Sequence, residues 1–198
     1  MAQQNVLSRI RSFLTPGKGL SKDQVARLNR LPPDERLAQL GVVLHDICVK
    51  TAARFVEEEH RRADSPFRNL PKTDLFHELL VMNFWVFERH FRGKMQPLLD
   101  HLYHHHNASF VLGWESSREK LLDSMRVKFR TYDQAWDDYT GHQDIFGRQA
   151  IGIIFGDQNV ASAPQAAFWL ITYADRTMKE FTKIEASVNQ IVGKEPSA

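Results

Sequence analysis

The most apolar stretch of the chain runs from Thr73 to Arg92 and predicts a helix buried over most of its surface. Its sequence is TDLFHELLVMNFWVFERHFR, without glycine or proline and too long for one strand. Charged residues and histidines interrupt it, which is not typical of a membrane-spanning helix. A helix this apolar must be covered by several neighbours. We therefore expect it at the centre of an all-helical protein.

A helical wheel divides this central helix into a charged arc and an apolar arc. Glu78 and Arg89 lie on the charged arc, and Trp85 falls among them. Asn83 and His90 instead fall on the apolar arc. Buried polar side chains cost about 1–3 kcal/mol each when they lack partners. We favour two satisfied core residues, and the alternative is that both face an interior site.

Apolar residues spaced three and four apart predict further helices on both sides of the central one. The long ones are expected at about 33–62, 109–139 and 164–192, and the short ones at 6–14, 22–29, 97–106 and 145–155. A strand over 151–155 is the competing interpretation of the glycine-rich region. The predicted fold is all-α, a bundle of about four long, mainly antiparallel helices with short N-terminal and connecting helices.

The 198 residues fit one bundle domain at 33–192, with short N-terminal helices at 1–32 packed on it or appended to it, and a tail at 193–198. No acid precedes Asp23, and the apolar residues of 6–14 give a basic amphipathic segment. We favour packing of this segment on its own domain. A targeting or membrane-surface role is the alternative.

Composition narrows the possible partners. Lysine and arginine number 26 against 24 acids, so the charge does not indicate a nucleic-acid partner. No apolar run is long enough for a transmembrane segment. Cys48, the single cysteine, excludes an internal disulfide and is compatible with a reducing cytoplasm, the location we expect. It lies on an apolar helix face, which favours an inert buried thiol.

Two histidines on apolar faces give the first candidate site. If the connection between their helices is centred near Phe67, an antiparallel hairpin places residues whose numbers sum to about 135 at one level, as for His45 and His90. Such a pair could bind a metal or an anion, or transfer a proton. A ligand site there would be lined by His45, Asn83, His90, Arg118 and Tyr132. Two separate, satisfied core histidines are the favoured alternative.

A histidine-rich run gives the second candidate site. In DHLYHHH, His101 and His105 share a helix face, and pairs at this spacing can bind Zn, Ni or Cu. The metal candidates are therefore His45, His90, His101 and His105. We favour a solvated run, because spacing alone leaves the other ligands unidentified.

The missing motifs favour a non-enzymatic function, although the sequence leaves catalysis undecided. The hydrolase elbow and the zinc-protease pattern are absent, and Glu57-x-x-His60 is a single half of a di-iron pattern. Trp85, Phe168 and Trp169 lie off the expected inward stripes. We predict a protein-interaction module that binds a protein partner or itself as a homodimer. The alternative is a bundle that binds a small ligand or metal, with enzymatic activity left open, and the sequence identifies no cofactor.

Overall fold

The computed structural model describes residues 20–92, 95–110, 115–137, 144–156 and 164–193. Over these residues the chain forms seven helices and no strand, which confirms the predicted all-α class. The helices are α2 (Lys22–Leu28), α3 (Pro33–Arg61), α4 (Lys72–Phe91), α5 (Gln96–Phe110), α6 (Glu115–Asp137), α7 (Asp144–Phe155) and α8 (Pro164–Val192). The glycine-rich segment is therefore a helix and not the competing strand.

Local chemistry accounts for where the first helices begin. Ser21 accepts a hydrogen bond from the Gln24 backbone, and the Gln24 side chain accepts one from the Ser21 backbone, forming a capping box for α2. α3 begins with Pro33 at a position where no backbone donor is needed, and Asp34 and Glu35 lie near the positive end of its dipole.

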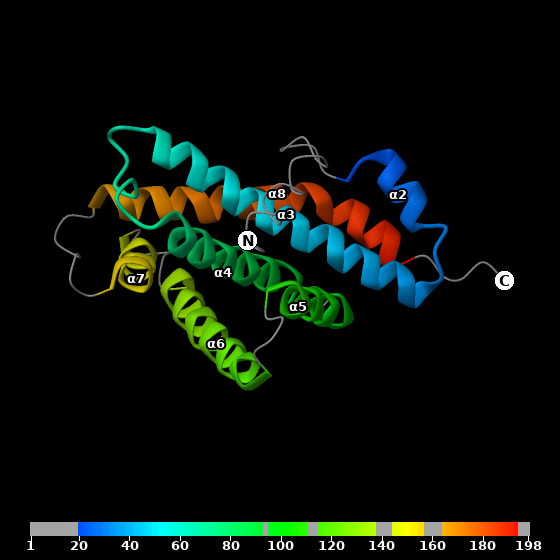
Figure 1. Ribbon diagram of the computed structural model, residues 1–198. Coiled ribbons are helices and arrows are strands. Elements are labelled where there is room, and N and C mark those ends of the chain that lie inside the picture. The colour runs from blue at the N-terminus through cyan, green and yellow to red at the C-terminus, as the bar shows by residue number, and fades with distance from the viewer. Residues whose placement is uncertain (1–19, 93–94, 111–114, 138–143, 157–163, 194–198) are drawn as a thin grey trace, which may run out of the picture.

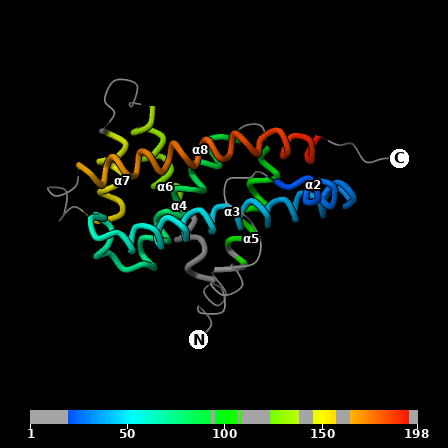
Figure 2. Tube along the Cα trace, turned by 90° about the horizontal axis from the view of Figure 1, so that it is seen from above, coloured from blue at the N-terminus to red at the C-terminus, as the bar shows by residue number. Residues whose placement is uncertain are grey.

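Helix α3 runs antiparallel to both α4 and α8. The connection over residues 62–71 turns the chain from α3 into α4 (Figure 1). Near the C-terminal end of α3, the Phe55 ring contacts Tyr173 of α8. Near its other end, Arg36 donates a hydrogen bond to the carbonyl of Ile191. Figure 2 shows α3 and α8 extending along the length of the molecule.

Helix α4 instead runs parallel to α8 and α6, so the long helices are of mixed direction rather than mainly antiparallel. Its contacts advance together with the residue numbers of both partners, as in Asn83–Tyr173, Phe87–Phe181, Glu78–Lys128 and Arg89–Asp137. The physical reason is connectivity. α5 separates α4 from α6, and α7 separates α6 from α8, so a further helix intervenes before each next long one.

The central position of α4 is confirmed, and one expectation about it is wrong. Most of its apolar arc is buried, including Leu79, Phe84 and Phe87 at 0% exposure. Trp85, expected on the outer arc as an interface marker, is also fully buried. It packs against Tyr132 and Trp136 of α6 and Phe146 of α7. These two helices cover the part of the outer arc around Trp85, while His77 and Arg92 on the same arc stay exposed.

Two helix pairs come very close together at glycines. A Cβ on Gly41 of α3 would lie 2.9 Å from the Cβ of His101, where α5 crosses α3. A Cβ on Gly147 of α7 would lie 2.7 Å from the carbonyl oxygen of Ala167 in α8. The first crossing brings the histidines of α5 against α3.

Leu28 anchors α2 in the same core, where α2 contacts α3 and α8. The predicted helix at 6–14 lies outside the described residues. Within the described residues, no helix combines the length and the apolarity needed to cross a bilayer.

Candidate functional site

Two buried imidazoles meet where α5 crosses α3. His45 lies on the buried face of α3, beside Leu44 and Cys48, and His106 lies on the buried face of α5, one turn after Leu102. The close approach at Gly41 brings these two faces together. His45 Nε2 lies 3.2 Å from His106 Nδ1, with both residues no more than 6% exposed.

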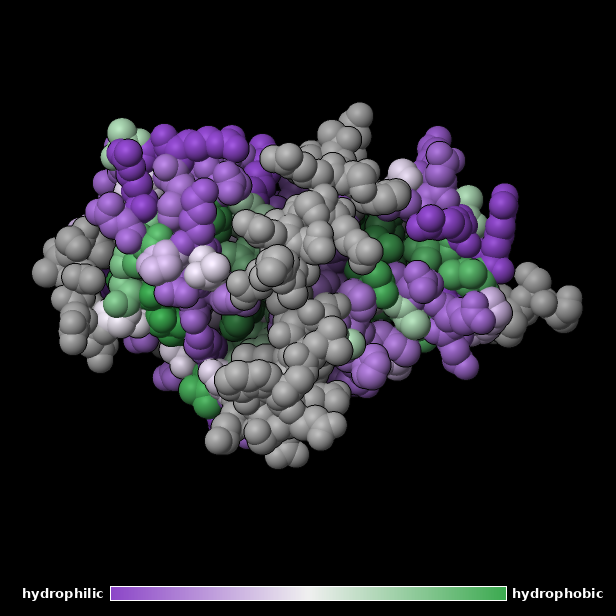
Figure 3. Space-filling model, in the orientation of Figure 1, coloured by the Kyte–Doolittle hydropathy of each residue, from purple (hydrophilic) through white to green (hydrophobic). Residues whose placement is uncertain are grey.

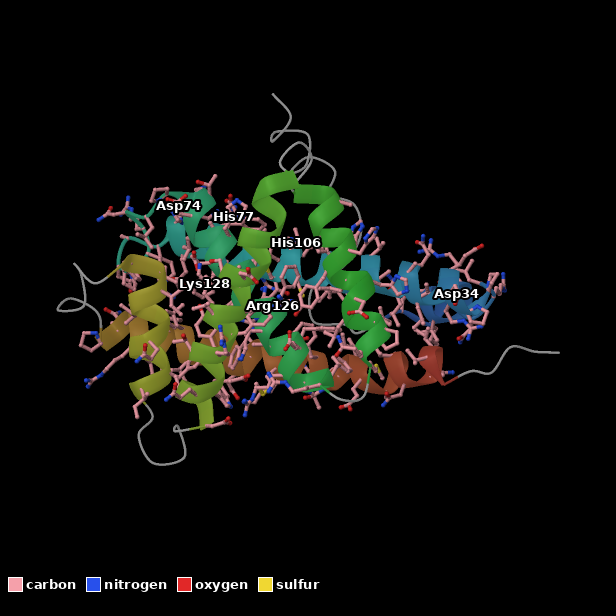
Figure 4. The ribbon with its side chains drawn as sticks, turned by 90° about the horizontal axis from the view of Figure 1, so that it is seen from below. Asp34, Asp74, His77, His106, Arg126 and Lys128 are labelled. Atoms are coloured by element: carbon pink, nitrogen blue, oxygen red, sulfur yellow. The ribbon has the colours of Figure 1, made fainter. Side chains whose placement is uncertain are left out.

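Aromatic rings and further histidines surround this pair. Phe84 of α4 lies against both imidazoles, with ring-centre distances of 5.8 Å to His45 and 4.7 Å to His106. The His105 ring meets His45 edge to face at 4.8 Å. His77 of α4, labelled with His106 in Figure 4, acts electrostatically on His106. We call His45, His77, His105 and His106 the histidine cluster.

Burial keeps the two central imidazoles neutral. It lowers the pKa of His45 to about 3, with further lowering by His106 and His105. Burial likewise lowers the pKa of His106 to about 4, with His77 and His105 acting in the same direction. A neutral imidazole carries one N–H and one lone pair. One ring therefore donates to the other, and the pair shares a single proton along its contact.

The structure gives His45 and His90 different partners. His45 lies level with Phe84, and Asn83 bonds to the carbonyl of Cys48, so facing residues of α3 and α4 sum to about 130 rather than 135. His90 lies about 9 Å further along the axis of α4 than Phe84. There its Nε2 is 3.1 Å from a carboxylate oxygen of Glu185 on α8. The hairpin register that suggested a shared site is therefore wrong by more than one turn.

The other predicted lining residues do not gather around His45. Asn83 is a satisfied core amide, which donates to Cys48 and accepts from the Tyr173 hydroxyl, both at 2.8 Å. Tyr132 packs against Trp85 and Phe146 on another side of α4, and its buried hydroxyl has no hydrogen-bond partner among the described residues. The Arg118 side chain lies outside the described part of the structure.

The metal candidates are also dispersed. His101 packs its Cβ against Gly41, while His105 contacts His45. Within the described residues, no group of three or more histidine, cysteine, aspartate or glutamate side chains is arranged to hold a metal ion. Cys48 is buried, and burial raises the pKa of its thiol well above the ordinary value, so the thiolate is disfavoured. The cluster is therefore a hydrogen-bonded imidazole pair with two neighbours.

Sequence reasoning missed His106, the residue that completes this pair. A signal for it was present, because Leu98 or Leu99, Leu102 and His106 repeat at the three- and four-residue spacing of a buried stripe. The sequence predicts that this helix ends at about residue 106, and a histidine at the end of a helix is usually exposed to solvent. The helix continues to Phe110, which places His106 inside it.

A second feature lies on the surface at the start of α8. Phe168 is 64% exposed, the highest value among the exposed large apolar side chains of the described residues. The neighbouring Trp169 is partly buried, with the Arg62 guanidinium 4.5 Å from its ring centre. Figure 3 shows apolar atoms at the end of the molecule where α7 and the start of α8 lie. The off-stripe position expected for Phe168 thus corresponds to real exposure.

Comparison with known proteins adds no identity to these observations. No family model matches the chain, no curated protein matches it, and no solved structure matches it.

Proposed function

We propose that this protein is a non-enzymatic protein-interaction module that pairs with a second copy of itself through the start of α8. The observation that carries the proposal is the exposure of Phe168 beside Trp169. Large aromatic side chains are enriched at the centres of protein interfaces. Most of the Phe168 side chain is open to solvent, so burial by a partner would remove substantial apolar area from water.

On α8, the described exposed residues next to Phe168 carry no charge, which favours a second copy as the partner. Pro164, Gln165 and Thr172 are the exposed residues near it on α8, and none is charged. The next charged side chain along this face is Asp175, which is paired with Lys179 at 2.6 Å. A twofold contact places identical surfaces against each other. An uncharged centre avoids the repulsion between like charges that such a contact would otherwise bring.

Trp169 supplies a rigid border to this surface. Its ring is held under Arg62, which is itself bonded to Asp64 at the end of α3. A side chain fixed before binding loses less conformational entropy when the partner arrives. Phe168 is therefore an exposed side chain that a partner can bury, and it lies next to Trp169, which is already held in place.

The test is self-association measured by sedimentation velocity over a wide concentration range. We expect a dimer that dissociates on dilution, and a monomer for Phe168→Ser at every concentration. Val127→Ser is the matched control, because Val127 on α6 is 54% exposed and lies outside the proposed contact. It should dimerise as the native chain does. A native chain that is monomeric up to several hundred micromolar, or a Phe168→Ser variant that still dimerises, would overturn the proposal.

A further inference from the structure

The histidine pair lies at the junction that attaches α5 to the rest of the core. Leu98, Leu99 and Leu102 give α5 an apolar face, and each is no more than 2% exposed. The hydrogen bond between His45 and His106 joins that face to α3 near one end of α5. Tyr103 adds a bond to Glu88 of α4 at 2.6 Å. The attachment of α5 thus combines apolar burial with these polar contacts.

The contact between the imidazoles requires that one of the facing nitrogens carries no proton. At 3.2 Å, a nitrogen with a hydrogen faces a nitrogen with a lone pair. If both rings become cations, two N–H groups point at each other and the hydrogen bond is lost. Two positive charges then lie together in a buried contact beside the ring of Phe84. Separation of α5 from α3 removes this repulsion and returns both cations to water.

Most of the surrounding titratable groups also disfavour a positive charge on these histidines. His77 on α4, together with His104 and His105 on α5, disfavours further positive charge in the cluster. Asp46 on α3 acts in the opposite direction on His105, but it is engaged by Lys50 at 2.6 Å. Burial of His45 and His106 is the largest effect on each, and it also disfavours the cation.

We infer that α5 is an acid-released helix, which separates from α3 and α4 when His45 and His106 both take up a proton. The released state exposes the leucines of α5 and the face of α4 around Phe84. The contacts that join α3, α4 and α8 through Asn83 lie outside this junction and persist. The inference is independent of the Phe168 contact, because it concerns a different part of the surface.

Native-state hydrogen exchange between about pH 4.5 and 6 tests the inference, with a chelator present to exclude metal effects. The amides of residues 98–106 report the opening of α5. Opening coupled to the uptake of two protons raises its equilibrium constant about 100-fold for each unit of falling pH, a logarithmic slope of about two. His45→Gln and His106→Gln should each lower that slope by about one, and the double variant by about two.

Two controls separate release of α5 from other effects of acid. His104→Gln replaces an exposed histidine of the same helix that acts on His105 and is not part of the pair. It should keep the slope of about two, because the pair still takes up two protons. The amides of residues 170–181 in α8 should not follow the slope, since they report the persisting core. If the double variant leaves the α5 amides unprotected from exchange at neutral pH, the single variants alone test the inference, since each should lower the logarithmic slope by about one.

Three results would overturn the inference. The first is a native chain whose α5 amides show no pH-dependent opening. The second is a set of histidine variants that keep the native slope. The third is an α8 that opens together with α5 at every pH, which would make the transition a global unfolding.

Discussion

At the scale of single residues, Asn83 has the clearest structural role. It is fully buried on α4, and its amide joins the carbonyl of Cys48 on α3 to the hydroxyl of Tyr173 on α8. Three helices are therefore connected at one level by one side chain. A buried amide with both ends satisfied stabilises one helix register, because a shift of any partner would leave polar atoms unpaired.

Replacing Asn83 with leucine should lower the free energy of unfolding by about 2–4 kcal/mol, because the buried Tyr173 hydroxyl loses its acceptor and the core must repack. Urea unfolding measures the change. Tyr173→Phe, which removes one hydrogen bond with little change of shape, should cost about 1–2 kcal/mol. In the double variant both partners are apolar, so its cost should be less than the sum of the two. Additive costs would show that the bond between the two side chains contributes nothing.

At the scale of elements, α6 is attached to α4 through Asp133. Its carboxylate accepts hydrogen bonds from Trp85 Nε1 at 2.9 Å, Arg89 at 3.0 Å and Arg92 at 2.5 Å. Burial raises the pKa of Asp133, but these hydrogen bonds outweigh it and hold the pKa below the ordinary value. A single carboxylate thus accepts hydrogen bonds from a buried indole N–H and from two guanidinium groups between α4 and α6.

Asp133→Ala should lower the free energy of unfolding by about 2–3 kcal/mol, since the Trp85 N–H is left without its acceptor and Arg89 and Arg92 each lose one of their carboxylate contacts. Chemical denaturation measures this difference. Asp123→Ala is the matched control on the same helix, because Asp123 is exposed and pairs with Arg126 at 3.2 Å on the surface. It should change stability by less than about 0.5 kcal/mol. Equal effects of the two substitutions would contradict the assigned role.

The crossing of α3 and α5 gives a second prediction at this scale. Gly41→Ala places a Cβ 2.9 Å from that of His101 and should destabilise the protein by about 1–3 kcal/mol, because one helix must move. Apart from the backbone of α7 itself, no described atom lies within 4 Å of a Cβ added at Gly152, so Gly152→Ala should stabilise the protein by about 0.5–1 kcal/mol through helix propensity. Thermal unfolding of both variants should show shifts of opposite sign. Stabilisation by Gly41→Ala would rule out the close crossing.

For the whole molecule, the histidine pair makes folding stability depend on pH. The folded-state pKa values of His45 and His106, about 3 and about 4, lie below the ordinary value of 6.5. At a pH between these folded-state pKa values and 6.5, the two histidines bind protons in the unfolded chain but not in the folded chain. Stability is therefore full above about pH 6.5 and falls as the pH falls through the window towards 4 and 3.

Between pH 7 and pH 5, each of the two histidines should account for a loss of roughly 2 kcal/mol in the free energy of unfolding. Urea unfolding at both pH values measures the loss. The His45→Gln and His106→Gln double variant should lose correspondingly less than the native chain over the same interval. A loss as large in the double variant would assign the acid sensitivity to other groups.

The sequence by itself determined the helical class and most of the residues that each long helix buries. The three- and four-residue spacing of apolar side chains located α3, α4 and α8 to within a residue or two, because a helix face repeats with a fixed period. The burial of Cys48 and the satisfied state of Asn83 followed from the same faces. Periodicity is a local property, so a linear pattern is enough to reveal it.

Only the tertiary structure decided which helix covers which face. The helical wheel assigns Trp85 to the outer arc, yet α6 and α7 bury it. The pairing of His45 with His106 rather than His90 depends on the register of α4 and on how closely α5 crosses α3 at Gly41. Crossings and registers are set by side-chain packing between elements distant in the chain. A one-dimensional pattern does not contain that information, and the candidate site therefore emerged only from the folded arrangement.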